Sequence, residues 1–586
     1  MNGFNEKLNK IKKHWPALLT AFFVGLIIFL PNVMSIYRLG TGNFNGIYPI
    51  FDKDETYYLT MAADVARGQK LGNPYLKEHQ NEHYLVPDLI EKFLVGESRV
   101  LGLDIPETFM ANDFILPFFG FIILYFFIFS LTDKRSISLI YSIFLFTIFI
   151  ASFGRPVNPQ LSFIFVIIGV WLIALIQKFL NQEIKEKKIY FAFFSLALVI
   201  GILVYIYPYF WTSLLVLLFL ILSFYTVKEK KFNYILPLLG FIFFLLILVI
   251  PYLINTWQIN HISYYSETLQ RIGLLNNHWP ACYFNTGLSL LTLFFYFLIK
   301  KKQEQNYFSL ALIISPVILN WQNVITGKYL QFSSHYYLVT IFFLTLAMII
   351  LLDKYDWREN KTNKNILIFL FAAIIILPVA YKQKGEVIGT FCRNLFQKNS
   401  SLADMQNYAP VFDWFNNNSE EGKVIYVLGK ASAFISIYTR NYEYMNGYAN
   451  AYLVSDSELE DRWVRQNIFL DINEEYIRSN SRGIWYNGLI DQYQNSIIRN
   501  KIIKALIGIN IQAEPETPQA FIDRVYKKYQ EVKKENIESA LKKYEIDYIL
   551  LDTKDGRYKG VLERLNNYKF IREVKKFDNY AIYEVS

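Results

Sequence analysis

Long apolar stretches constrain the fold of this chain more than any other feature. Each carries few or no charges and approaches the roughly 20 residues that an α-helix needs to cross a bilayer. About eleven such stretches are present, and hydrophobic residues make up 53% of the 586. They cover 16–36, 111–131, 136–151, 160–180, 189–206, 208–226, 232–255, 284–300, 307–322, 337–352 and 365–381. A soluble core helix explains one such stretch but not so many. The sequence therefore predicts a polytopic α-helical membrane protein.

Lysine and arginine gather on alternate short loops, which predicts the orientation. They precede the first span and follow the even-numbered spans, at 7–13, 133–135, 178–188, 228–231, 300–302 and 354–364. The intervening short loops carry only Arg155 and Lys328. By the positive-inside rule, the N-terminus is cytoplasmic and the chain is a multi-pass protein of the cell membrane. The net charge of +9 is largely this bias and gives no argument for a nucleic-acid partner.

The chain divides into two predicted domains. Residues 1–381 form the membrane domain, which includes an outer loop at 37–110. Residues 382–586 are too many for a tail and form an extracytoplasmic soluble α/β domain. Its predicted strands and helices are 424–429, 546–552, 570–574 and 580–585, and 521–532 and 537–544.

The segment 51–68 places three carboxylates, those of Asp52, Asp54 and Glu55, at the start of a short amphipathic helix. Gly68 can end this helix. Asp54 lies four residues before Tyr58, so it borders the apolar face. A partly desolvated carboxylate there is suited to take a proton from a hydroxyl group. Glu55 could orient the acceptor or hold a metal. Alternatively, Asp52 and Glu55 form a capping box that needs no chemistry. Both can hold, with Asp52 capping the helix and Asp54 reacting.

This segment resembles the first outer loop of the GT-C superfamily of integral-membrane glycosyltransferases. The resemblance rests on Asp54-Glu55-Thr56-Tyr57-Tyr58, followed by Ala62, Ala63 and Ala66-Arg67-Gly68. It is closest to the branch of the protein O-mannosyltransferases and aminoarabinose transferases. The Trp-Trp-Asp motif of the oligosaccharyltransferase branch does not occur in the sequence. The order of a cytoplasmic N-terminus, a large first outer loop, about eleven spans and an outer C-terminal domain also matches the superfamily.

The resemblance implies transfer of a sugar from a polyprenyl-phosphate-linked donor at the outer face of the membrane. By position, the base is Asp54 and its partner is Glu55, and these two would hold a divalent cation if one is used. The acceptor stays open among a protein, a lipid and a glycan. No nucleotide-binding glycine loop occurs, which fits a lipid-phosphate donor better than a nucleotide sugar.

A lipid-phosphate donor needs cations near the headgroups, because arginine and lysine bind phosphate through charge-assisted hydrogen bonds. Arg155, the lone charge in a proline-rich outer turn, is the first candidate; it could equally be an interfacial anchor. The loop 321–337 is the second, and it could equally be an ordinary hairpin. With Tyr58 from the acidic helix, the expected substrate-binding residues are Arg155, Asn323, Lys328, Gln331 and His335. The aromatic loop 256–283 suits carbohydrate stacking, but we favour an interfacial belt.

These observations predict a membrane glycosyltransferase that inverts the anomeric centre and acts in glycosylation at the cell envelope. A lipid-glycan transporter or flippase is the first alternative. It predicts ionisable groups within the spans and internal repeat symmetry, and neither is expected from the sequence. A non-catalytic, membrane-anchored assembly protein is the second alternative; it would tolerate the loss of Asp54 but not of its C-terminal domain.

Overall fold

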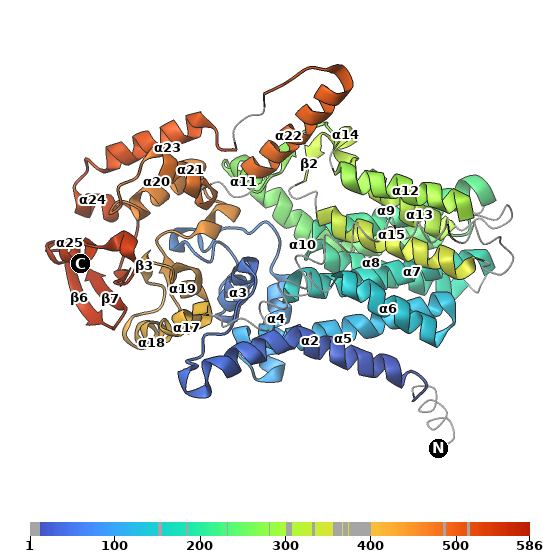
Figure 1. Cartoon of the computed structure of the whole chain (residues 1–586), viewed down its shortest axis with the longest axis horizontal. Coiled ribbons are helices and arrows are strands. Elements are labelled where there is room, and N and C mark those ends of the chain that lie inside the picture. Colours follow the sequence, from blue (N-terminus) through green and yellow to red (C-terminus); the bar gives the residue numbers. More distant parts are fainter. Residues whose placement is uncertain are drawn as a thin grey trace.

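The computed structural model describes residues 12–149, 155–182, 186–230, 232–280, 282–299, 307–330, 335–355, 366, 373, 400–484, 488–512 and 516–586. Figure 1 shows a bundle of long helices on one side and a region containing a β-sheet on the other. Helices α3 and α4, which follow the first long helix in the chain, lie between them. The acidic segment is therefore placed where the bundle meets the sheet region.

The bundle consists of helices that coincide with the first ten predicted spans. They are α2 (Trp15–Leu39), α5 (Ile105–Thr132), α6 (Arg135–Phe149), α7 (Ser162–Gln182), α8 (Glu186–Val204), α9 (Pro208–Phe224), α10 (Ile235–Ile259), α12 (Tyr283–Ile299), α13 (Tyr307–Asn320) and α15 (Tyr336–Lys354). Among the described residues, seven helical segments are long and apolar enough to cross a membrane, and those of α6, α12 and α13 are shorter. The predicted span 365–381 lies outside the described residues, apart from two isolated positions.

The helices of the bundle are apolar on their outer faces as well as inside. Phe243 on α10 is 68% exposed and Phe219 on α9 is 66% exposed, whereas Val339 and Phe342 of α15 are fully buried. An α-helix satisfies its own backbone hydrogen bonds, so such surfaces are stable when they face lipid. The fold is that of a polytopic α-helical membrane protein, as the sequence predicts.

Two connections of the bundle carry short elements of their own. Between α2 and α5 lie η1 (Thr41–Asn43), α3 (Lys53–Ala66), η2 (Lys77–His79) and α4 (Leu89–Leu101); we call this segment the first loop. Between α10 and α12 lie α11 (Tyr265–Arg271) and β1 (Leu275–Asn276). Strand β1 pairs with β2 (Lys328–Tyr329), which follows α14 (Gln322–Thr326). This two-stranded antiparallel pair, the β1–β2 pair, thus links the segment before α12 to the segment before α15.

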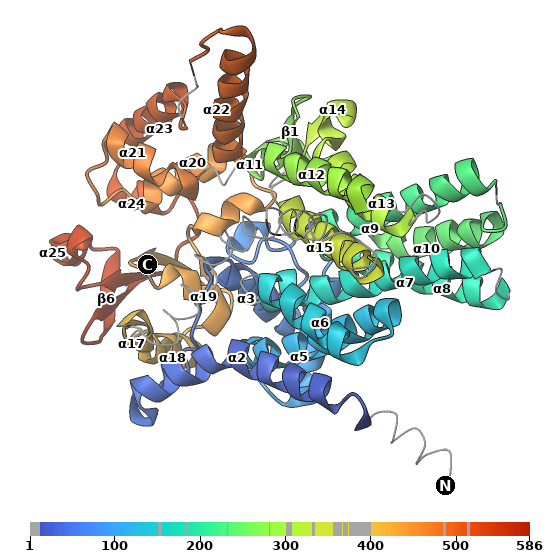
Figure 2. The same ribbon diagram turned by 45° about the vertical axis from the view of Figure 1, so that its right-hand side comes forward.

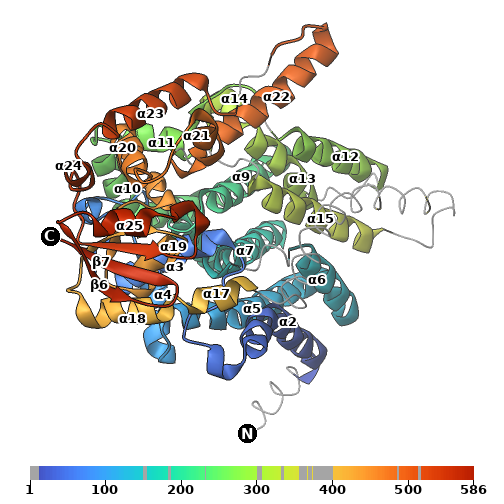
Figure 3. The same cartoon turned by 60° about the vertical axis from the view of Figure 1, so that its left-hand side comes forward.

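The C-terminal sheet domain, described over 400–586, has five strands in the order β4-β3-β5-β7-β6. They are β3 (Val424–Leu428), β4 (Tyr442–Glu443), β5 (Tyr548–Asp552), β6 (Ile571–Lys576) and β7 (Tyr580–Val585). Strand β3 is parallel to β4 and β5, while β7 is antiparallel to β5 and β6. Figure 3 shows β6 and β7 at the edge of the molecule away from the bundle. The predicted strands are confirmed, including the final antiparallel pair.

Helices surround this sheet and extend from it. They are α17 (Ser400–Gln406), α18 (Ala409–Asn418), α19 (Ser432–Tyr438), η7 (Gly447–Ala451), α20 (Asp456–Gln466), α21 (Glu474–Asn480), η8 (Ser481–Gly483), α22 (Gly488–Ile507), α23 (Gln519–Val532), α24 (Ile537–Leu541), η9 (Gly556–Tyr558) and α25 (Val561–Asn566). All five residues of β3 are buried, which explains its continuous apolar sequence. The boundary at 381/382 lies outside the described residues and stays a prediction.

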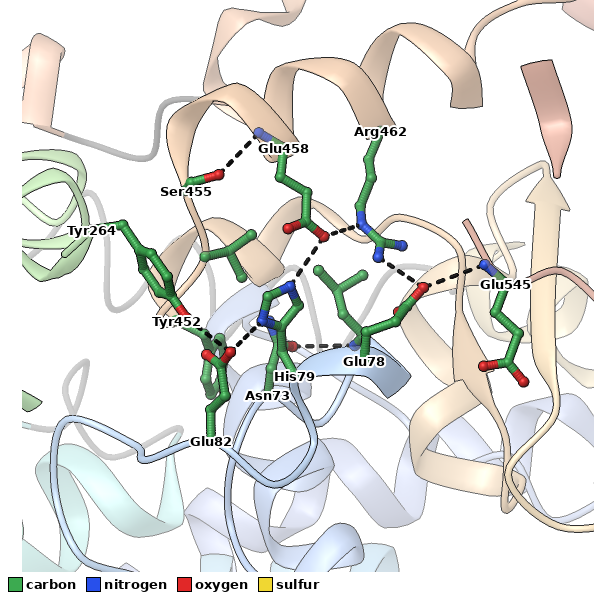
Figure 4. A network of polar contacts seen from close by, with 12 residues as sticks. Asn73, Glu78, His79, Glu82, Tyr264, Tyr452, Ser455, Glu458, Arg462 and Glu545 are labelled. Atoms are coloured by element: carbon green, nitrogen blue, oxygen red, sulfur yellow. Dashed lines mark hydrogen bonds and ion pairs between the residues drawn. The ribbon is translucent and has the colours of Figure 1, made fainter. Parts of the chain in front are cut away.

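A buried polar network ties the first loop to the sheet domain (Figure 4). His79 of η2 bonds through Nδ1 to Glu82 at 2.8 Å and through Nε2 to Glu458 of α20 at 3.0 Å. Arg462 of α20 is fully buried and pairs with Glu458 at 2.7 Å and with Glu78 at 2.9 Å. The backbone contributes too, since Glu443 N–H of β4 donates to the Tyr75 carbonyl at 2.8 Å. These contacts fix the acidic helix relative to the sheet domain.

Candidate active site

The acidic helix begins at its own carboxylate. Asp52 is the N-cap of α3, with extended backbone angles, and its Oδ1 accepts a hydrogen bond from Asp54 N–H at 2.9 Å. This bond satisfies one of the amide donors that the first turn of a helix leaves unpaired. Asp52 thus has the capping role that the sequence allows. The helix ends before Gly68, whose φ of +81° suits glycine.

Asp54 lies against the arginine that the sequence selects for phosphate binding. Arg155 precedes the π-helical turn η4 (Pro156–Leu161) at the start of α7. Its Nη1 donates to Asp54 Oδ2 at 2.6 Å, and its Nε lies 3.6 Å from Asp52 Oδ2. Asp54 and Arg155 are 101 positions apart in sequence. The Asp54 side chain stays 50% exposed and that of Arg155 28%, so a ligand can reach both groups.

The surroundings of Asp54 favour its use as a base. Burial raises the pKa of its carboxyl above the usual value, the Arg155 guanidinium opposes that rise, and the neighbouring Asp52 adds to it. A carboxylate with a raised pKa holds a proton more readily than an ordinary aspartate, which makes it a stronger base when it is ionised.

Glu55 lies in a different environment from Asp54. Its side chain is buried, with the residue 6% exposed, and burial together with the nearby Asp113 of α5 raises its pKa well above the usual value. Asp113 accepts hydrogen bonds from Asn32 Nδ2 and Gln160 Nε2, both at 2.8 Å. Glu55 therefore belongs to a buried carboxyl pair held by amides. The expectation that the spans carry no ionisable group is wrong at Asp113, which lies inside α5 and is the second member of this pair.

His335 and Tyr207 extend the site from the bundle. The Tyr207 hydroxyl, just before α9, shares a hydrogen bond with Nδ1 of His335, just before α15. Burial, with a smaller contribution from Arg155, lowers the pKa of His335 to about 3. The imidazole is therefore neutral at physiological pH. It acts as a hydrogen-bonding group here and carries no positive charge for a phosphate.

The sheet domain contributes a phenol to the same place. Tyr448 of η7 lies with its ring centroid 5.8 Å from that of Tyr57 on α3. Burial and the nearby Asp54 raise the pKa of Tyr448 to about 12, so its hydroxyl stays protonated. Tyr58 also faces Arg155 and raises the pKa of that guanidinium, which burial alone would lower. The site thus draws on the first loop, the bundle and the sheet domain.

Three residues here were not selected from the sequence. In the sequence, Tyr207 is the residue before Pro208, and Tyr448 lies in a tyrosine-rich segment. Neither carries a signal that separates it from packing residues. Asp113 does carry one, because it is the only Asp, Glu, Lys or Arg in the stretch 111–131.

The other expected substrate-binding residues have different surroundings. Lys328 Nζ donates to Asn276 Oδ1 across the β1–β2 pair at 2.7 Å. Asn323 is buried, and its Nδ2 donates to the carbonyls of Asn277 at 3.0 Å and Trp279 at 2.6 Å. Both residues make these contacts within the β1–β2 pair and the segment that follows β1. Gln331 lies outside the described residues.

The carboxylates of Asp54 and Glu55 in the acidic helix face different partners. Asp54 is bonded to the Arg155 guanidinium, while Glu55 is buried toward Asp113. Two carboxylates that face different partners, one of them a cation, do not converge on one ion. No group of three or more His, Cys, Asp or Glu side chains in the described ranges is arranged to hold a metal ion. A divalent cation shared by Asp54 and Glu55 stays a prediction.

Comparisons with known proteins give no family. No family model and no curated protein matches the chain. Similar solved structures include the oligosaccharyltransferase AglB of Archaeoglobus fulgidus with an inhibitory peptide and a dolichol-phosphate, at a TM-score of 0.45 and 11% identity over 81% of this chain and 69% of that one. The apo oligosaccharyltransferase of this organism has a TM-score of 0.43 and 10% identity, over 92% of this chain and 70% of that one. Its complex with Zn and sulfate has a TM-score of 0.44 and 12% identity, over 92% of this chain and 68% of that one. All these TM-scores lie below 0.5, and the function proposed next does not rest on them.

Proposed function

We propose that this protein is a membrane glycosyltransferase that moves a sugar from a polyprenyl-phosphate donor to an acceptor hydroxyl. The observation that carries the proposal is the contact between Asp54 and Arg155 at 2.6 Å. In this contact, a half-exposed carboxylate of raised pKa lies beside a permanently charged guanidinium. Arg155 precedes α7, so the contact lies at an end of the helix bundle. The resemblance of 54–68 to the GT-C acidic loop, closest to the O-mannosyltransferase and aminoarabinose-transferase branch, supports the same reaction.

The reaction is a single displacement at the anomeric carbon. Asp54 takes the proton of the acceptor hydroxyl as its oxygen forms a bond to that carbon. The bond from the anomeric carbon to the phosphate oxygen breaks, and its electron pair leaves with the phosphate. Arg155 binds the phosphate through charge-assisted hydrogen bonds and stabilises its added negative charge. One displacement inverts the configuration of the anomeric carbon.

The remaining polar groups fit supporting roles in this reaction. Tyr448 offers a protonated phenol that can donate to sugar or phosphate oxygens, Tyr58 offers a second phenol beside Arg155, and His335 holds the Tyr207 hydroxyl in place. Glu55 is buried toward Asp113 and does not share the role of base.

The location follows from the distribution of charge on the loops. With the N-terminus in the cytoplasm, the first loop and the sheet domain lie on the extracytoplasmic side, where a lipid-linked sugar displayed on that face is within reach. The sheet domain, proposed to begin near residue 382, would then contact the acceptor, which is a protein, a lipid or a glycan.

Sugar transfer by the full-length protein tests the proposal. Wild type and Asp54→Asn are reconstituted with a panel of polyprenyl-phosphate-linked sugars, and release of the lipid phosphate is measured. Loss of the base should lower turnover about 10²–10⁴-fold. Because the base acts when ionised, wild-type turnover should also fall as the pH drops through the raised pKa of Asp54.

The matched control is Asp88→Asn, which removes a carboxylate of the same loop that pairs with Lys92 at 2.8 Å. Its turnover should match that of the wild type. Equal turnover by the wild type and a folded Asp54→Asn protein would contradict the proposal and leave Asp54 as a residue of the helix start.

A further inference from the structure

We propose that the end of α22 docks on the membrane surface beside α12 and binds the headgroup of an anionic phospholipid there. Two independent features carry this inference. One is an apolar end of α22 that the protein itself leaves uncovered. The other is a cavity at the foot of α12 that presents positive charge and amide donors.

The end of α22 is apolar and exposed although it belongs to the sheet domain. Leu506 is 79% exposed and Ile507 66%, and in the segment that follows Ile509 is 55% and Ile511 40% exposed. Four large aliphatic residues within six positions form an exposed run that water disfavours, and such a patch marks an interaction surface. Lys501 and Lys504 on the same helix are exposed as well. Apolar residues with interspersed lysines are typical of helices that lie at a membrane surface.

The position of α22 matches this composition. Figures 1 and 2 show it extending from the sheet domain, away from the β-strands. A cavity of about 240 Å³ lies between α22 and the segment from β1 to the start of α12. Tyr283 and Trp279 line that cavity, and Tyr283 is the first residue of α12, a helix of the bundle. The cavity therefore lies at the level where the bundle leaves the membrane.

Exposed tryptophans mark the same level. Trp257, near the end of α10, is 66% exposed, and Trp279 is 48% exposed. Indole side chains concentrate at the headgroup level of membranes. The interfacial belt favoured from the sequence for 256–283 thus agrees with the position of α22.

The chemistry of the cavity selects an anion. Arg499 of α22 lines it and forms no ion pair with any described residue, while its Nε donates to Asn500 Oδ1 at 3.2 Å. The Oδ1 atoms of Asn276 and Asn277 are already engaged by Lys328 Nζ at 2.7 Å and by Trp279 N–H at 2.8 Å. These hydrogen bonds orient both amide groups. Among the residues whose side chains the structure describes, no carboxylate lines the cavity.

A guanidinium and amides around a small space fit a phosphate group. An anionic phospholipid supplies such a phosphate, and the bilayer that holds it supplies hydrocarbon for the exposed end of α22. Each basic residue near an anionic surface favours the docked state by about fivefold. Lys328 and Asn323, expected to bind the donor, would on this account shape a lipid site.

A fluorescent probe on the end of α22 tests the docking. Cys282 and Cys392 are replaced by serine in the full-length protein, and Leu506→Cys is labelled with a polarity-sensitive dye. The protein is placed in nanodiscs of phosphatidylcholine, with or without phosphatidylglycerol, that contain a spin-labelled quencher lipid. Quenching should be strong and greater with phosphatidylglycerol. The matched control Lys559→Cys, on the exposed surface of the sheet domain, should show little quenching.

Charge variants then test the headgroup site. Arg499→Gln should lower the ratio of docked to undocked protein about fivefold in phosphatidylglycerol discs, whereas Lys527→Gln on α23 should leave it unchanged. Ile509→Cys gives a second probe position if Leu506→Cys does not fold. Quenching at 506 or 509 no stronger than at 559 would refute the docking. Equal quenching in neutral and anionic discs, or in Arg499→Gln, would refute the phospholipid site.

Discussion

The buried histidine at the junction of the first loop and the sheet domain predicts that this junction weakens at alkaline pH. Burial lowers the pKa of His79, but its hydrogen bonds to Glu458 and Glu82 outweigh burial and raise the pKa to about 9. The imidazolium is therefore charged at neutral pH and pairs with two carboxylates. The groups around it are Glu78 and Glu82 of its own loop, Glu458 and Arg462 of α20, and Tyr264, which donates to Glu82 (Figure 4).

The size of the effect follows from the pKa. A rise from the ordinary 6.5 to about 9 corresponds to about 3 kcal/mol of stabilisation. Because the pKa is higher in the folded than in the unfolded chain, this stabilisation is fully present below about pH 6.5. It is lost as the pH rises through about 9. For a domain of this size, such a loss lowers the unfolding temperature by about 6–12 °C.

Thermal unfolding of the detergent-solubilised protein, followed between about pH 6 and pH 9.5, measures this loss. His79→Gln should be less stable than the wild type at the acidic end and should show a flatter dependence on pH. The control His261→Gln changes an exposed histidine that bonds only to the carbonyl of Trp257 among described residues, and it should follow the wild type. If His79→Gln and the wild type lose stability in parallel across this range, the paired imidazolium is not the cause.

Two further substitutions separate structural from chemical roles. Arg271 of α11 is 1% exposed, pairs with Asp456 and donates to three carbonyls of the sheet domain, those of Asn450, Tyr452 and Val454. Arg271→Met should lower the free energy of unfolding by about 3–5 kcal/mol, because it leaves a carboxylate and carbonyls unpaired. A calorimetric transition unchanged from the wild type would contradict this. Glu55→Gln should keep sugar transfer within about threefold of the wild type, because Glu55 is buried toward Asp113 and its burial disfavours the charged form that the substitution removes. A loss as deep as that of Asp54→Asn, measured in the same phosphate-release assay, would give Glu55 a charged role.

The helices of the bundle could be predicted from sequence because membrane spans depend on a local property. A run of apolar residues of sufficient length satisfies its own backbone bonds and needs no distant partner to be recognised. The break at Tyr207-Pro208 separates α8 from α9 for a similarly local reason, since proline is favoured at the first position of a helix. The strands β3 and β5 were visible because both are buried and carry continuous apolar residues.

The contacts of the site depend on three-dimensional proximity, and sequence gives them only in part. Asp54 and Arg155 were each selected for their chemistry, but nothing in the sequence states that they touch across 101 positions. Glu55, one residue from Asp54, looks equivalent in sequence and differs only because the helix turns it toward Asp113. Lys328 looked like a phosphate ligand because it is a lone cation, although its amine is engaged by Asn276.

The acidic helix is not a site by itself, because the sheet domain supplies part of its environment. Burial is the main cause of the raised pKa of Asp54, and Tyr448 of the sheet domain is among the groups that face it. Arg271 holds the segment that follows Tyr448 by bonding to the carbonyls of Asn450 and Tyr452. If that segment moved away, Asp54 would gain water and its pKa would fall toward the ordinary value, which would weaken it as a base. The membrane domain holds the reacting groups in this account, and the sheet domain sets how strongly one of them binds a proton.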